Sequence, residues 1–438
     1  MRRFHRSWIL IAPLVAAAAI GLVGAGTPEL TTWTLNTTGL TGYGGLPANV
    51  QLVRYSANYV YVSSSGIPSY TIGPWPSDPN VPSNQGYVFK IPRIPAVNAG
   101  TKTSTPLGAM AVWTNGVAAY NPLDAHSYNN QNIWHQNAIL VEGASFDACL
   151  GHPAPGGRYH NHQNARCVYT ANAATHSPIL GWSFDGYPIY GPYAFTNTDG
   201  SGGIARMRSS YRLRNITTRT SLPDGTVLTA PQYGPAVSVT FPLGYYVEDF
   251  EFVSGLGDLD AYNGRFAVTP EYPLGTYAYF VTIDATGASA YPYAIGPKYN
   301  GVVATENMTT MGHVVVSEAV TTYTAAPAPG VVANSLLLGK SGIDGLVLSW
   351  GPSCGSGAVD YGIFEGTLLS WYSHAAVACH DVSGDLTETI TSSPGDRYYF
   401  VVPLGISDEG SFGAGTSGVE RPRGSSYCDS SQLLASCP

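Results

Sequence analysis

The sequence predicts a mainly β protein in which a large, irregular β-rich domain is followed by a small β-sandwich. Only 11% of the 438 residues are charged, whereas Gly numbers 51, Pro 32 and Tyr 30. Long helices usually carry more Lys, Glu and Arg on their exposed faces, so this composition favours short strands joined by turns. Apolar and polar residues also alternate in several short segments, and a small, uncharged segment separates two such regions.

The chain begins with a segment typical of a secretory signal peptide. Residues 1–25 have a basic start, an apolar run and then small residues, with Val23 and Ala25 placed for cleavage. No later segment approaches the about 20 apolar residues that a membrane helix requires. We therefore expect no membrane span after cleavage and a secreted, periplasmic or cell-surface location. The net charge of −8 argues against a nucleic-acid partner.

Residues 321–335, TTYTAAPAPGVVANS, have the composition of a linker, and we place a domain boundary near residue 328. The first domain then spans residues 26–328 and the second spans residues 329–438. Short apolar runs separated by Gly, Ser, Pro and Asp in the second domain are typical of a β-sandwich. The strands of the first domain are predicted by alternating segments at residues 49–64, 108–121, 236–253 and 276–284.

Only one segment of the first domain has a spacing that favours a helix. In residues 131–151, the apolar residues Ile133, Ala138, Val141 and Ala144 recur near helical spacing, and the segment ends at a glycine. We predict a short helix there.

Residues 151–167, GHPAPGGRYHNHQNARC, contain three histidines in one loop. His160 and His162 are two residues apart, so on a strand they project from the same face and can reach one ion. His152 precedes them, and His176 follows in the sequence. Neutral imidazole suits copper and zinc, and a carboxylate can complete the ligand set. We predict a transition-metal site, copper or zinc, at these four histidines.

Two other interpretations of the histidines remain open. The rings could hydrogen-bond backbone carbonyls without binding a ligand, or they could act as general acid and base without a metal. Glu142 and Asp185 are candidate catalytic residues, because a carboxylate within hydrogen-bond reach of a bound water can accept its proton. Asp185 also precedes Gly186 and could instead cap a turn.

Six cysteines in an exported protein most simply form three disulfides. Neighbours in the sequence suggest the pairs Cys149–Cys167, Cys354–Cys379 and Cys428–Cys437. The first pair would enclose the three histidines and stabilise their loop by about 3 kcal/mol. It would also remove its thiolates from the ligand set, which disfavours a Cys-rich structural zinc site.

Two further kinds of ligand are compatible with the sequence. Asp258, Asp260 and Asn263 lie in a short turn whose oxygen atoms could hold calcium, although the acid that ends an EF-hand loop is missing. A turn with Asx hydrogen bonds is the simpler interpretation. The abundant Tyr and Trp residues would allow stacking on an extracellular polysaccharide or matrix component, but they equally fit a β core.

The segments FDACLGHPAPGGRYHNH, HSPILGWSFDGYPIYGP and DLDAYNGRF follow one another within residues 105–300. Together they resemble the YHYH-domain family of secreted proteins, and residues 159–162 occupy the Tyr-His-Tyr-His motif, with Asn161 in place of its second Tyr. The resemblance implies a fold and a site position but no reaction. A second partial copy at residues 277–280, Tyr-Ala-Tyr-Phe, lacks both histidines. Residues 329–438 resemble fibronectin type III-like modules.

These observations support three hypotheses about function. The first is an exported protein that binds copper or zinc, with copper slightly favoured because imidazole without thiolate suits copper(II) in an oxidising compartment. The second is a surface or adhesion protein that contacts carbohydrate and has structural histidines. The third is a metal-assisted hydrolase or oxidase in which the histidines hold the ion and Asp185 or Glu142 moves protons.

Overall fold

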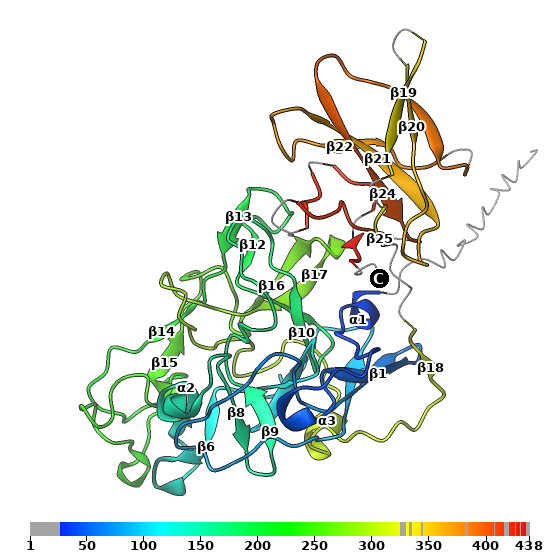
Figure 1. The fold of residues 1–438 in the computed structure, drawn as a ribbon. Helices are drawn as coiled ribbons and strands as arrows, with labels where there is room; N and C mark the ends of the chain where they lie inside the picture. The colour runs from blue at the N-terminus through cyan, green and yellow to red at the C-terminus, as the bar shows by residue number, and fades with distance from the viewer. Residues whose placement is uncertain are drawn as a thin grey trace, which may run out of the picture. The chain divides into compact units, whose positions relative to one another are not determined.

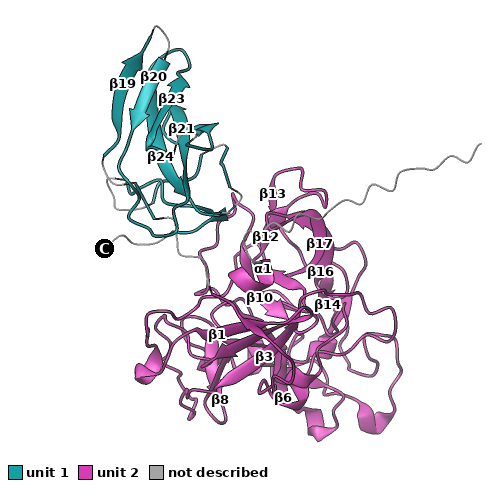
Figure 2. Ribbon diagram, turned by 90° about the vertical axis from the view of Figure 1, so that its right-hand side faces the viewer, with its two compact units in different colours: residues 1–25, 326–438 teal, residues 26–325 magenta. Residues whose placement is uncertain are grey.

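The computed structural model describes residues 27–324, 330–332, 335–342, 345–381, 384–406, 408–415, 420–424, 426–429 and 431–434 (Figure 1). The predicted signal peptide, residues 1–25, and Cys437 lie outside the described residues. Among the helices that are described, none is both long and apolar enough to cross a membrane. The chain divides into two compact units, one ending at Ala325 and the other beginning at Ala326 (Figure 2).

The larger unit contains two main sheets, which confirms its β-rich class. The first sheet has four strands in the order β18-β1-β2-β3. Its strands are β1 Val50–Tyr55, β2 Tyr59–Ser64, β3 Tyr87–Pro92 and β18 Thr321–Thr322. The predicted strand segment at residues 49–64 is therefore an antiparallel hairpin of β1 and β2.

The second sheet has eight strands in the order β16-β17-β11-β10-β4-β5-β9-β8. These strands are β4 Ala109–Trp113, β5 Ala118–Tyr120, β8 Gly151–Ala154, β9 Arg158–Asn161, β10 Ile179–Ser183, β11 Pro188–Tyr190, β16 Gly264–Thr269 and β17 Tyr272–Phe280. The antiparallel pair β4–β10 lies at the centre of this sheet. Outward from β4 come β5, β9 and β8, and outward from β10 come β11, β17 and β16. On one side, β5 pairs in parallel with β9 of the β8–β9 hairpin. On the other side, β11 pairs in parallel with β17 of the β16–β17 hairpin. The sheet is thus built from two halves with equivalent topology.

One hydrophobic core joins the two sheets. Val53 and Phe89 of the four-stranded sheet are fully buried in the same cluster as Val112, Trp182 and Ile189 of the eight-stranded sheet. Burial of large side chains of this kind contributes about 1.5–3 kcal/mol each. The β8–β9 and β16–β17 hairpins extend from this core as the two outer edges of the larger sheet.

The remaining elements of the larger unit are short. Three two-stranded sheets are formed by β6 Leu123–Ser127 with β7 His135–Asn137, β12 Tyr193–Phe195 with β13 Ile204–Arg206, and β14 Tyr211–Leu213 with β15 Phe250–Phe252. The single-turn helices are α1 Pro28–Thr31, α2 Ala138–Val141 and α3 Glu306–Thr309. The 3₁₀ turns are η1 Tyr43–Gly45, η2 Tyr128–Asn130, η3 Gly143–Ser145, η4 Ala230–Gln232 and η5 Val247–Asp249.

Two predicted elements differ from the structure. The helix expected within residues 131–151 is limited to α2, which has four residues, and strand β7 precedes it directly. The strand expected over residues 236–253 is wrong except for β15 at its end. This segment contains Pro242, which lacks an N–H for a strand ladder, and the buried Asp249 carboxylate instead accepts hydrogen bonds from Gly244 and Tyr246.

The smaller unit is a β-sandwich. One sheet contains β19 Leu337–Ser341, β20 Gly345–Ser349 and β23 Thr387–Thr391, and the other contains β21 Asp360–Thr367, β22 Ala375–Ala378, β24 Arg397–Leu404, β25 Asp408–Glu409 and β26 Ser431–Gln432. Leu348 and Ile390 of the first sheet share a core with Ile363 and Val401 of the second. The fibronectin type III-like assignment of this sandwich stays a prediction.

The disulfides agree with the sequence prediction at one pair. Cys149 is bonded to Cys167, as predicted, whereas Cys379 is bonded to Cys428. The predicted pairs Cys354–Cys379 and Cys428–Cys437 are therefore wrong, although Cys354 is also disulfide-bonded. The reason is that the fold places Cys379, directly after β22, beside a segment distant in sequence, where the Ser426 hydroxyl accepts from the Ala376 N–H at 2.9 Å. The prediction had paired sequence neighbours. Disulfides are typical of proteins outside the cytoplasm.

Candidate metal centre

The three clustered histidines lie on the hairpin formed by β8 and β9. Its turn contains Gly156 and Gly157, which have φ of 84° and 75°, in the left-handed region that favours glycine. A Cβ on Gly157 would also lie 2.4 Å from the Ser83 hydroxyl, so only glycine fits where the turn packs against that segment.

The register of this hairpin gathers the imidazoles on one face. His152 on β8 is directly opposite His160 on β9, and their ring centroids are 4.7 Å apart. His162 lies two residues beyond His160, on the same face, with ring centroids also 4.7 Å apart. All three side chains are buried, with 2–7% of each residue exposed.

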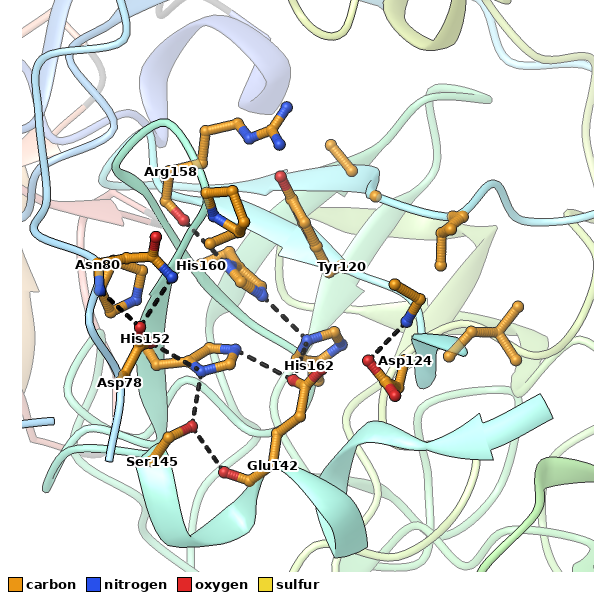
Figure 3. Close-up of a pocket in the computed structure, with 18 of the residues that line it drawn as sticks. Asp78, Asn80, Tyr120, Asp124, Glu142, Ser145, His152, Arg158, His160 and His162 are labelled. Carbon is orange, nitrogen blue, oxygen red and sulfur yellow. Dashed lines mark hydrogen bonds and ion pairs between the residues drawn. The ribbon is translucent and has the colours of Figure 1, made fainter. Parts of the chain in front are cut away.

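A carboxylate from outside the hairpin completes the cluster. Glu142 directly follows helix α2, and its Oε2 lies 3.1 Å from His152 Nε2 and 3.2 Å from His162 Nε2. His160 Nε2 lies 2.9 Å from His162 Nε2. The four potential ligand atoms all lie within 4.8 Å of one another, and Figure 3 shows them converging on one region.

The hydrogen bond that each ring makes through Nδ1 indicates which ring nitrogen carries the hydrogen and which has a lone pair. His160 Nδ1 lies 2.9 Å from the Arg158 carbonyl oxygen, and His162 Nδ1 lies 2.5 Å from the Asn121 carbonyl oxygen. A carbonyl oxygen only accepts, so both Nδ1 atoms carry the hydrogen. Both Nε2 atoms then present lone pairs toward each other.

His152 follows the same pattern through a hydroxyl group. The Ser145 hydroxyl donates to the Glu142 carbonyl oxygen at 2.7 Å, so its oxygen accepts from His152 Nδ1 at 2.8 Å. His152 Nε2 and Glu142 Oε2 lie at ion-pair distance from each other, and neither makes a conventional hydrogen bond to another group of the described residues. When all three imidazoles are neutral, four lone-pair-bearing atoms converge with no hydrogen between them, an arrangement that a cation stabilises and that is otherwise electrostatically unfavourable.

The surroundings keep the His160 imidazole neutral. Burial, with further contributions from His162 and His152, places the pKa of His160 well below its usual value of 6.5. The Tyr120 ring stacks on His160 at a centroid distance of 3.9 Å. Neutral imidazole is the form that binds a metal ion. Next to the cluster, burial together with a hydrogen bond to Glu142 raises the pKa of Asp124 to about 6.

The opposite face of the hairpin is fixed by other groups. The Cys149–Cys167 disulfide links the chain before β8 to the chain after β9. The Tyr159 hydroxyl donates to the Asp147 carboxylate at 2.9 Å, and the same carboxylate accepts from the backbone N–H groups of Cys149 and Gly151. These bonds hold the histidine side chains in position, because they fix the backbone that carries them.

Two predicted site residues lie away from the cluster. His176 contacts the Tyr190 and Phe195 rings, and its Nδ1 lies 2.8 Å from the Ser177 carbonyl oxygen. Asp185 is fully buried and accepts hydrogen bonds from the Tyr279 hydroxyl, the Gly301 N–H and the Ser183 hydroxyl. Its place is in a buried structural network that ties the β10–β11 turn to β17, so Glu142 alone of the two catalytic candidates is at the site.

The residues considered for calcium have other roles. Asp258 pairs with Arg208, with the carboxylate 3.0 Å from the guanidinium Nε. Asp260 accepts from the backbone N–H groups of Tyr262 and Gly264, as the Asx-turn interpretation expects. The Asn263 amide donates to two backbone carbonyls. These side chains are engaged separately and do not form a shared oxygen site, so the calcium interpretation is not supported.

A pocket of about 740 Å³ borders the cluster of His152, His160, His162 and Glu142. The four potential ligands line one part of it, together with Asp78, Tyr120 and Asp124, and other parts are lined by proline, leucine and methionine side chains. Figure 3 shows the cluster residues together with Arg158, which lies on β9 beyond His160. The site is thus open to a small molecule even though the histidine residues are largely buried.

Sequence reasoning missed several residues of this site. Asp78, Tyr120 and Asp124 come from segments separated from the histidines by tens of residues, and no spacing pattern connects them. Arg158 was missed although it is two residues before His160 in the same strand, a spacing that predicts a shared face. That spacing was the available signal.

Comparison with protein families agrees with the motifs that surround this centre. Neither the curated proteins nor the solved structures with which the chain was compared include a match to it. Residues 88–291, which contain the whole histidine hairpin and both halves of the eight-stranded sheet, match the family model described as YHYH protein.

Proposed function

We propose that this protein is exported and binds one transition-metal ion, copper(II) or zinc, through His152, His160, His162 and Glu142. The observation that carries the proposal is the convergence of three imidazole Nε2 atoms and one carboxylate oxygen, all within 4.8 Å of one another. Ligand atoms each about 2.0–2.2 Å from one ion lie about 2.8–3.6 Å apart for bond angles between 90° and 110°. The contacts of 2.9, 3.1 and 3.2 Å fall in this range.

The ligand types favour these metals over others. Imidazole nitrogen is typical of copper and zinc sites, whereas magnesium and calcium prefer oxygen atoms. Copper(II) is slightly favoured over zinc because the ligand set has no thiolate and copper(II) binds such nitrogen and oxygen sites more tightly. Cys149 and Cys167 are joined in a disulfide and are not available as ligands.

Metal content tests this proposal directly. Untagged protein is loaded with copper(II) or zinc, separated from free ion and measured by elemental analysis. We expect close to one ion per chain for the wild type, a strong loss for Glu142→Gln, and background for the pair His160→Ala and His162→Ala. His176→Ala is the matched control, because it removes an imidazole outside the cluster and should leave metal content unchanged. Equal metal content in all four proteins would refute the site.

A catalytic use of the metal is the second candidate, and the adjoining pocket with Asp124 beside Glu142 favours it. A bound copper or zinc ion supplies Lewis acidity and lowers the pKa of a coordinated water. Asp124, in hydrogen-bond contact with Glu142, could hold a proton at the edge of the cluster. Turnover of ester, amide and phenol substrates by loaded wild-type protein, and its loss in Asp124→Asn at unchanged metal content, would support this candidate. Metal-free protein that binds polysaccharide as well as loaded protein would favour the adhesion hypothesis.

A further inference from the structure

The pocket beside the metal cluster contains a cationic side chain without a charged partner. Arg158 lines this pocket, and none of the described carboxylates forms an ion pair with it. Its Nε is buried and has no hydrogen-bond partner in the described part of the chain. Within the described residues, the guanidinium Nη1 donates to the sulfur of Met311 at 3.7 Å. A buried Nε–H group without an acceptor is costly unless a ligand supplies one.

The neighbours of Arg158 are hydrogen-bond donors. Tyr87 and Tyr120 line the same pocket as Arg158, and their hydroxyls hydrogen-bond to each other. A phenol hydroxyl, with a usual pKa of about 10, is a hydrogen-bond donor at neutral pH. A guanidinium with adjacent phenol hydroxyls is suited to bind a carboxylate, which accepts several hydrogen bonds at once.

The strand geometry relates this donor group to the metal cluster. Arg158 and His160 are two residues apart on β9, so they share a face and are about 7 Å apart along the strand. The pocket that contains both is about 740 Å³, which is within the usual size range for small-molecule sites. The lining of the pocket also includes the apolar side chains of Leu107, Met308 and Met311.

We infer that this pocket binds a small organic carboxylate with an apolar body, whose acid group pairs with Arg158 while its other end reaches the metal cluster. The inference rests on the proposed function only for the second end of the ligand, because the anion contact is made by Arg158 and the tyrosines. It names the substrate class that the proposed metal site would accept. Arg158 acts here as a binding residue that selects anions over neutral molecules of the same shape.

The test uses octanoate as the probe and octanamide as its uncharged counterpart. Each competes for the pocket with 8-anilinonaphthalene-1-sulfonate, an apolar anion whose fluorescence rises on burial. With the full chain, we expect octanoate to displace this dye at concentrations at least about 10-fold lower than octanamide, since charge-assisted hydrogen bonds contribute about 1.5–3 kcal/mol. Arg158→Gln should remove this preference, and Arg158→Lys should keep part of it.

Controls separate this inference from the proposed metal site. Arg166→Gln changes an arginine that does not line the pocket and should behave as wild type, and melting temperatures verify folding of every variant. The preference for octanoate should persist in the His160→Ala and His162→Ala protein, where metal binding is lost. Equal displacement by octanoate and octanamide, or an unchanged preference in Arg158→Gln, would overturn the inference even if one metal ion per chain is found. Loss of the metal with an intact, Arg158-dependent preference would refute only the proposed function.

Discussion

The two outer hairpins of the eight-stranded sheet share a scaffold but differ in chemistry. In β8–β9, Asp147 Oδ1 accepts from the N–H of Cys149 at 2.8 Å and of Gly151 at 3.1 Å. In β16–β17, Asp260 Oδ1 accepts from the corresponding N–H groups of Tyr262 and Gly264 at the same two distances. The two loops are therefore equivalent bond by bond.

The equivalence extends to the tyrosine that supports each loop. Tyr159 donates to Asp147 at 2.9 Å, and Tyr277 donates to Asp260 at 3.0 Å. In both hairpins a glycine leaves room for this hydroxyl, since a Cβ at Gly151 or at its counterpart would lie about 2.5 Å from it. The backbone register is also the same, with one strand pairing in parallel to the adjacent hairpin.

The side chains on the other face are where the hairpins differ. Register aligns His152 with Arg265 and His160 with Ala278, and the next position on the same face aligns His162 with Phe280. The second hairpin thus forms the same scaffold without any of the three imidazoles. This comparison teaches that the fold does not require histidine at these positions, which argues against a purely structural role for the cluster.

The largest effect on metal affinity is expected when His160 and His162 of the β8–β9 hairpin are replaced by the residues at the equivalent positions of the β16–β17 hairpin. The double variant His160→Ala and His162→Phe copies Ala278 and Phe280 and removes two of four ligands. We expect metal affinity to fall by more than about 100-fold, because changes even outside the direct ligands cost 10–100-fold. Isothermal titration with zinc or copper(II) measures this. If the variant instead unfolds while the single control His176→Ala stays folded, the histidines are structural and the comparison fails.

The disulfide is the next difference between the hairpins, because Cys149–Cys167 brackets the first one and no described disulfide brackets the second. Replacing both cysteines with alanine should lower the free energy of unfolding by about 3 kcal/mol. Denaturant unfolding of the metal-free protein gives this value. The same variant should bind metal more weakly, and an unchanged affinity would show that the disulfide does not organise the site.

The two loop aspartates allow a matched test. Asp147→Asn and Asp260→Asn should each destabilise the fold by about 1–3 kcal/mol, since each change weakens several buried hydrogen bonds. Only Asp147→Asn should also weaken metal binding, because only its hairpin carries the ligands. Chemical unfolding and metal titration of both variants give the two readouts. A loss of metal affinity in Asp260→Asn as large as in Asp147→Asn would contradict this division of roles.

The smallest predicted effect concerns His176, in the half of the sheet that lacks the cluster. Burial lowers its pKa below 6.5, so the unfolded chain binds more protons than the folded chain as pH falls below that value. His176 therefore reduces stability progressively as the pH falls from about 6.5. His176→Phe, which suits the contacts with Tyr190 and Phe195, should make stability less dependent on pH between about 6.5 and 5. An identical pH profile for variant and wild type would refute this assignment.

Local patterns in the sequence predicted the parts of this structure that depend on local contacts. The His160–His162 spacing on a strand, the turn at Gly156 and Gly157, and the Cys149–Cys167 pair all arise within a few residues of one another. The β class followed from composition and alternation. These features could be predicted because strand periodicity and turn conformations are determined by neighbouring residues.

Contacts between distant segments were not predictable in the same way. Cys379 meets Cys428 through packing of segments 49 residues apart, and Tyr120 reaches His160 because β5 pairs with β9. His176 and Asp185 are close to the histidine loop in sequence, but the chain enters the other half of the sheet before reaching them. The partial repeat at residues 277–280 was visible, but its equivalence to the histidine hairpin required the hydrogen bonds of Asp260.

The central claim is that one metal ion binds between three imidazole Nε2 atoms and the Glu142 carboxylate. X-ray diffraction from crystals of the copper- or zinc-loaded protein, collected on both sides of the absorption edge of the metal, locates the ion without reference to any variant. We predict one anomalous peak at about 2.0–2.2 Å from the Nε2 atoms of His152, His160 and His162. Loaded crystals with no peak at this position, or with the ion bound elsewhere, would contradict it.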